Sequence, residues 1–118
     1  MKVLVVEDNE RNLKLVRDVL SHAGFEVVCA GSGEEGVEVA RAARPDVVLM
    51  DIGLPGMSGV EALAALRAAG VAAPVCALTA YAMKDDRARL LGAGFDAYLE
   101  KPISVRELPG QVEALIRR

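Results

Sequence analysis

Polar side chains follow four short apolar runs of the chain, and their types are those that bind cations and phosphate. The acids Glu7 and Asp8 follow the first run, and the lone acid Asp51 ends a later one. The hydroxyl of Thr79 and the ammonium of Lys101 stand after two further runs. Together, three carboxylates, one hydroxyl and one ammonium could bind a phosphate and a cation.

The spacing of apolar and turn-forming residues predicts the elements that must position these side chains. Short apolar runs alternate with segments of helical periodicity, which indicates repeated β-α units and a parallel sheet covered on both faces. The expected strands lie near 2–6, 25–30, 46–51, 74–78 and 97–100. Ligands bind outside the carboxyl ends of such strands, so the four positions should meet in one pocket.

Helices are predicted after each strand, and the last of them departs from the usual pattern. The first four are expected near 9–23, 32–43, 58–69 and 82–91. In the last, Pro109 would be the fifth residue of a helix that began after Ser104, where its ring meets a carbonyl of the preceding turn. We therefore predict a final helix that is kinked or starts late, from about Leu108.

The expected pocket favours a particular chemistry. Neighbouring carboxylates repel one another unless a cation joins them, and hard oxygen ligands with room for water suit Mg²⁺. Lys101 can pair with a phosphate as a point charge, and Thr79 can hydrogen-bond one of its oxygens. With Asp51 at the centre, the pattern predicts an aspartyl-phosphate, a known form of covalent carboxylate catalysis.

These motifs, in this order and at these separations, resemble the receiver domain of two-component response regulators over essentially the whole chain. The matching residues are Glu7-Asp8, Asp51 to Gly59, Thr79-Ala80 and Lys101-Pro102. Segments 80–85 and 101–105 are most similar to stand-alone receivers of the cell-division regulator type. The implied fold is one α/β receiver domain over 1–118, with a doubly wound, flavodoxin-like (βα)5 parallel sheet of strand order 2-1-3-4-5.

The resemblance also implies roles for individual residues. Asp51 would accept the phosphoryl group, Lys101 would contact it, and Thr79 would be a switch hydroxyl that moves to meet it. Tyr98 would then turn inward to fill the space that Thr79 leaves. A cis peptide bond is expected between Lys101 and Pro102.

The same resemblance implies a set of metal ligands. Mg²⁺, for which Mn²⁺ can substitute, would be held by Asp8, Asp51 and the backbone carbonyl of Gly53, with Glu7 reaching it through water. Gly53 departs from the family pattern, because receivers usually carry a side chain there. That side chain and the residue at Tyr81 control how water reaches the phosphoryl group.

The implied function is that of a cytoplasmic single-domain response regulator. A histidine kinase or a histidine phosphotransfer protein would supply the phosphoryl group, and a downstream protein target would receive the signal. The protein would catalyse its own phosphorylation and dephosphorylation and would be a monomer when unphosphorylated. At 118 residues the chain is too short for a receiver plus an output domain.

Composition excludes some other classes of partner. The net charge is −3 and only two Tyr and two Phe occur, so neither a basic patch nor a stacking platform is available for nucleic acid. The apolar run before Glu7 is far too short to span a membrane.

Cys29 and Cys76 lie in apolar runs without metal-ligand spacing and are expected to be buried thiols. His22 is expected at the surface near a helix end.

Parts of the sequence also fit four alternatives to this interpretation. The chain could be a receiver-like interaction module that works without phosphate, or a receiver fragment of a hybrid histidine kinase. A Mg²⁺-dependent phosphohydrolase with Asp51 as nucleophile is disfavoured, because Gly53 offers no second carboxylate as general acid. The segment 31–36 matches the dinucleotide fingerprint GxGxxG, but Glu34 and Glu35 would face the pyrophosphate, and Ser32 fits a helix N-cap.

Overall fold

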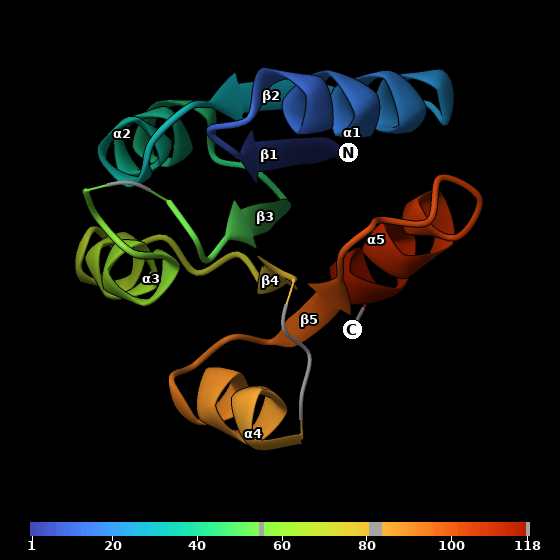
Figure 1. The fold of residues 1–118 in the computed structure, drawn as a ribbon. Helices are drawn as coiled ribbons and strands as arrows, with labels where there is room; N and C mark the ends of the chain where they lie inside the picture. Colours follow the sequence, from blue (N-terminus) through green and yellow to red (C-terminus); the bar gives the residue numbers. More distant parts are fainter. Residues whose placement is uncertain (55, 81–83, 118) are drawn as a thin grey trace.

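A computed structural model describes residues 1–54, 56–80 and 84–117 of the chain (Figure 1). Strands and helices alternate along it. Their bounds are β1 Lys2–Val6, α1 Glu10–His22, β2 Glu26–Ala30, α2 Gly33–Ala43, β3 Val47–Asp51, α3 Gly59–Ala68, β4 Val75–Thr79, α4 Lys84–Gly92, β5 Ala97–Glu100 and α5 Leu108–Ile116.

The strands form one parallel sheet in the order β2-β1-β3-β4-β5, which confirms the predicted fold class. Figure 1 shows α1 and α5 on one face of this sheet and α2, α3 and α4 on the other. The sheet therefore extends on both sides of β1, with β2 on one side and β3 on the other. The carboxyl ends of β1 and β3, where the order reverses, lie side by side.

The apolar runs form two cores because alternate strand residues point to opposite faces of the sheet. Val3 and Val5 pack beneath α1 and α5, whereas Leu4 and Val6 belong to the core beneath α2 and α3. Strands covered on both faces need apolar side chains at successive positions. This explains why β1, β3 and β4 are nearly continuous apolar runs.

The final helix starts late, as predicted. The α5 helix begins at Leu108, whose N–H donates to the carbonyl of Ser104. The Ser104 hydroxyl accepts from the N–H of Glu107, so a turn precedes the helix. Pro109 falls in the first helical turn, where the hydrogen bond that proline cannot make is not required.

Several other expectations can be compared with the structure. Ser32 is the N-cap of α2, with its hydroxyl accepting from the N–H of Glu35, which supports the capping interpretation of the glycine-rich segment. The starts of β2, β3 and β4 lie one residue later than predicted. The expected start of the fourth helix near Ala82, together with Tyr81 and Pro55, lies outside the described residues.

One prediction about the cysteines is wrong. Cys76 is fully buried in β4, and burial raises the pKa of its thiol to about 12. Cys29 is only half-buried, because β2 is an edge strand with a neighbour on one side only.

His22 is exposed at the end of α1, as expected. Within the described chain, the helices are too short or too polar to cross a membrane.

Gly59 allows α3 to start against the backbone that follows β3. A Cβ at Gly59 would stand 2.6 Å from the Cα of Ile52, so alanine would displace the main chain. We expect Gly59→Ala to lower the free energy of unfolding by about 1–3 kcal/mol, measured by urea denaturation.

The matched control is Gly110→Ala in α5, where an added Cβ meets nothing within 4 Å. This substitution should raise the free energy of unfolding by up to about 1 kcal/mol, because alanine favours the helix. Equal changes in the two variants would contradict the packing argument for Gly59.

Candidate functional site

The residues predicted to act together lie at one edge of the sheet. Glu7 follows β1, Asp51 ends β3, Thr79 ends β4 and Lys101 follows β5, so all stand at the carboxyl ends of neighbouring strands. The backbone N–H of Lys101 donates to the carbonyl of Thr79 at 2.7 Å, which ties the last two positions together. The Lys101-Pro102 peptide bond is cis.

The ammonium of Lys101 joins two buried carboxylates. Its Nζ lies 3.2 Å from Oδ2 of Asp51 and 3.5 Å from Oε2 of Glu7. Both acids are buried, whereas the Lys101 side chain is 22% exposed. Because a buried charge without a partner is costly, this ammonium is what allows negative charge to lie there.

Three acids form a cluster that could hold a cation. Ligand oxygens of Glu7, Asp8 and Asp51 all lie within 4.8 Å of one another. Asp8 is exposed, so water can complete the coordination of an ion there. The backbone N–H of Gly53 donates to Oδ1 of Asp51 at 3.0 Å and fixes the orientation of that carboxylate. A donor set made only of oxygen fits a hard divalent cation.

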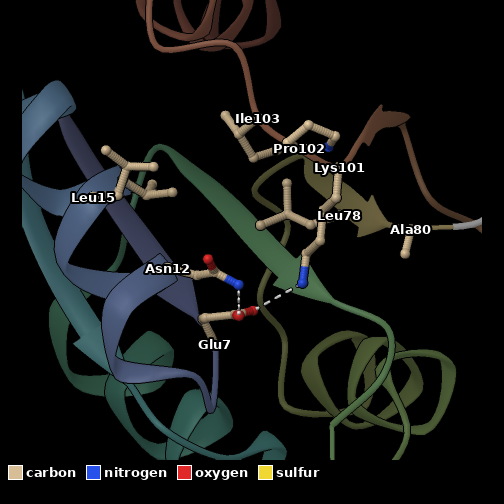
Figure 2. Close-up of a pocket in the computed structure, with 9 residues that line it drawn as sticks. Glu7, Asn12, Leu15, Leu78, Ala80, Lys101, Pro102 and Ile103 are labelled. Atoms are coloured by element: carbon tan, nitrogen blue, oxygen red, sulfur yellow. Dashed lines mark hydrogen bonds and ion pairs between the residues drawn. The ribbon is translucent and has the colours of Figure 1, made fainter.

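Asn12 is a site residue that the sequence analysis missed. Its side-chain amide donates to Oε1 of Glu7 at 3.1 Å, whereas Lys101 contacts the other carboxylate oxygen, Oε2 (Figure 2). Asn9 caps α1 by accepting from the N–H groups of Arg11 and Asn12, which sets where the helix begins. A polar residue in the first turns of a helix is too common to single out from sequence alone.

Tyr98 lies outside the acid cluster. It stands on β5 opposite Ala77, is half-buried, and packs against the core beneath α2 and α3. The guanidinium of Arg87 lies over its ring, 5.6 Å from the ring centroid. Thr79 is buried at the end of β4.

The pKa values of the two buried acids move in opposite directions. Burial raises the pKa of Glu7 to about 7, and a hydrogen bond with Asp51 adds to this effect. Burial also acts to raise the pKa of Asp51. Hydrogen bonds from Glu7 and the Gly53 N–H, together with the Lys101 ammonium, outweigh it and lower that pKa. Below about pH 7 the pair therefore holds a proton on Glu7, whereas Asp51 stays ionised.

The raised pKa of Glu7 predicts how the free energy of unfolding of the metal-free protein depends on pH. The pKa of Glu7 rises from 4.5 to about 7 on folding, so between these values the folded state binds more protons than the unfolded state. Stability should therefore fall as the pH rises through this window, by on the order of 2 kcal/mol. The lowered pKa of Asp51 makes stability rise with pH instead, but only at acidic pH near or below its ordinary pKa of 3.8.

Urea unfolding in the presence of a chelator, over this pH range, measures the effect. The Glu7→Gln variant keeps the shape of the side chain but cannot titrate, so its curve should be flatter than that of the wild type. Parallel curves would show that Glu7 carries no shifted proton.

Comparison with known proteins agrees with this geometry. A family model described as the response regulator receiver domain matches residues 3–113. The polar-differentiation response regulator DivK of Brucella anthropi is 46% identical over 105 residues, covering 87% of this chain and 85% of DivK.

Solved structures give the same result. The receiver domain of Francisella response regulator 1452 has a TM-score of 0.92 and 29% identity, covering 99% of this chain and 97% of that chain. The receiver domain of the sensor histidine kinase PA1611 of Pseudomonas aeruginosa, which holds a magnesium ion in its active-site cleft, has a TM-score of 0.89. It is 35% identical, covering 99% of this chain and 98% of that one. The chain belongs to the response regulator receiver domain family.

Proposed function

We propose that this chain is a response regulator whose Asp51 accepts a phosphoryl group from a phosphohistidine in a Mg²⁺-dependent reaction. The observation that carries the proposal is the Lys101 ammonium, 3.2 Å from Oδ2 of Asp51 and beside the cluster of three acids. A nucleophilic carboxylate, a phosphate-binding cation and a cation site lie together at the sheet edge where ligands bind.

Asp51 suits the role of nucleophile. Its lowered pKa keeps the carboxylate ionised at neutral pH. The N–H of Gly53 holds Oδ1, whereas Oδ2 faces Lys101. In the reaction a carboxylate oxygen of Asp51 forms a bond to phosphorus, and the bond between phosphorus and the donor imidazole nitrogen breaks on the opposite side.

Charge on the transferred group must be neutralised, and several residues are placed to do this. Lys101 would exchange its contact with Asp51 for a phosphoryl oxygen, and the Thr79 hydroxyl would hydrogen-bond another. Asp8, Asp51 and the Gly53 carbonyl would hold Mg²⁺, with Glu7 acting through water. When bound, Mg²⁺ supplies positive charge beside the phosphoryl oxygens. The magnesium ion in the PA1611 receiver supports this choice, and Mn²⁺, which takes the same ligands, can replace it.

The signal would leave the pocket through Thr79 and Tyr98. Thr79 is buried beside β5, and its carbonyl accepts from Lys101, so movement of Thr79 toward the phosphoryl group changes packing between β4 and β5. Tyr98 is half-buried and would turn inward to fill the space that Thr79 leaves. This is a two-state side-chain switch of the kind that links a phosphorylation site to a protein surface.

The phosphoryl donor would be a histidine kinase or a histidine phosphotransfer protein, and the output a contact with a downstream protein in the cytoplasm. The likeness to DivK favours a single-domain regulator that is monomeric without phosphate. The likeness to the PA1611 receiver favours a second candidate, the receiver segment of a hybrid kinase, with the same phosphoryl chemistry. A module that works without phosphate would not need the buried pairing of Lys101 with Asp51.

Acetyl phosphate and Mg²⁺ should add one phosphoryl group to the protein, detected by intact mass. Asp51→Asn should abolish the product, and Lys101→Ala should slow its formation by about a hundredfold, since one charge-stabilising group is lost. Asp18→Asn, which removes an exposed acid of α1, is the matched control and should react normally. Undiminished phosphorylation of Asp51→Asn would refute the assignment.

The switch can be followed by fluorotyrosine NMR, because the chain has only Tyr81 and Tyr98. Beryllofluoride with Mg²⁺ should shift the Tyr98 resonance, which Tyr98→Phe identifies. Thr79→Ala should reduce the shift, since the hydroxyl that moves is missing. An unmoved Tyr98 resonance in protein that has bound beryllofluoride would show that Tyr98 is ordinary packing.

A further inference from the structure

A depression of about 430 Å³ lies at the edge of the sheet opposite the acid cluster. It is bounded by the end of α2 and by the loop 69–73 between α3 and β4, two helices that cover the same face of the sheet (Figure 1). These segments precede the amino ends of β3 and β4, whereas the acid cluster lies at the carboxyl ends. The length of a five-residue strand, about 15 Å, separates the two places.

Two arginines at the end of α2 line this depression. Arg41 belongs to the last turn of the helix and Arg44 is its C-cap, so the two are neighbours three residues apart. Both are exposed. Within the described residues, Arg41 makes one long ion pair, with Nη1 3.8 Å from Oε1 of Glu38, and Arg44 makes none.

Nearby acids leave these two guanidinium groups free to meet a ligand. Asp46 accepts from the backbone N–H of Lys2, and Asp96 accepts from the N–H of Val75 and from Arg67. Among the described residues that line the depression, none is an acid. The depression is therefore positively charged.

The backbone of Arg44 has a conformation that its side chain disfavours. Its φ is 51°, in the left-handed region, where the described chain otherwise has only glycines. Helices commonly end with glycine in this conformation, because a Cβ is strained there. An arginine thus stands where glycine would fit the backbone better, which points to a role for its side chain.

The opposite wall of the depression is a loop that Arg67 holds in place. Nη1 of Arg67 donates to the carbonyls of Val71 and Ala73, at 2.8 and 2.7 Å. Because the N–H and C=O of a trans peptide point in opposite directions, the N–H of Ala72 points away from Arg67. Within the described chain, the N–H groups of Ala72 and Ala73 form no hydrogen bond. Two backbone donors and two guanidinium groups therefore border one space.

These donors favour an anionic ligand, and the size of the space favours a peptide. The planar fork of arginine matches a carboxylate through two parallel hydrogen bonds. A volume of about 430 Å³ suits a drug-sized molecule, so a single phosphate ion would leave most of it empty. The net charge of −3 repels anions at long range, so the two arginines must provide the attraction locally.

We propose that this depression is a docking site for a protein partner that presents a short acidic segment. Carboxylates of that segment would pair with Arg41 and Arg44, and its main chain would lie against the small residues of the loop 69–73. Docking at the amino edge leaves the acid cluster open. The inference goes beyond the proposed function and holds whether or not Asp51 is phosphorylated.

Hexaglutamate with blocked ends is the probe, added to the ¹⁵N-labelled full chain at low ionic strength, where surface charges are least screened. The amide resonances of Arg44, Ala72 and Ala73 should shift and reach saturation, and hexaglutamine should leave them unmoved. Arg44→Gly removes the guanidinium and suits the backbone, so the fold is kept. It should weaken binding by about threefold to tenfold, the loss expected for one exposed charge-assisted pair.

Arg106→Gly is the matched control. Arg106 is also exposed but does not line the depression, so its variant loses the same charge and should bind like the wild type. Equal weakening in the two variants, or wild-type affinity in Arg44→Gly, would overturn the inference. Shifts at Gly53 and Lys101 in place of the loop would put the peptide at the acid cluster, with the same consequence.

Inorganic phosphate separates a peptide site from a simple anion site. Phosphate should bind more weakly than hexaglutamate, because it can occupy only part of the depression. Phosphate that binds as tightly as the peptide and displaces it would reject the acidic segment as the ligand.

Discussion

The carboxyl edge of this sheet depends on one electrostatic constraint, which is that buried carboxylates need a positive partner. Glu7 and Asp51 lie close together in a setting where charge is poorly solvated, and Lys101 is the ammonium that reaches both. Below about pH 7, a proton on Glu7 relieves the remaining repulsion between the two acids. A bound divalent cation would take over that task, so the proton and the metal are alternative ways to satisfy the same group of oxygens.

The two apolar cores hold this charged group in place without taking part in its chemistry. Because β1, β3 and β4 are covered on both faces, their ends cannot move apart without exposing apolar surface. The backbone positions of Glu7, Asp51 and Thr79 at the strand ends are therefore held in place, while the Thr79 side chain can still turn. Lys101 comes from the short segment after β5, where the Thr79 carbonyl holds its backbone N–H, and its long side chain reaches the acids from there.

The sequence supported prediction best where a local rule has one physical solution. Short apolar runs that end in Asp51 or Thr79 and are bounded by turn signals are typical of buried strands. Pro109 left two outcomes, a kinked final helix or a late one. Prediction failed where the answer depended on tertiary position. Cys29 is half-buried because of strand order, which its own neighbours in sequence do not encode. Asn12 gains its role only when α1 packs beside Glu7.

Lys101 links the parts of the site because it takes part in each of them. Its ammonium pairs with the acids, its backbone N–H is held by the Thr79 carbonyl, and its side chain lines an apolar groove between α1 and the segment that follows β5. Under the proposed function, arrival of a phosphoryl group draws the ammonium away from the acids. Ile103, two residues further on, lines the groove wall. The acid cluster and the groove therefore share Lys101 and the short segment that carries it.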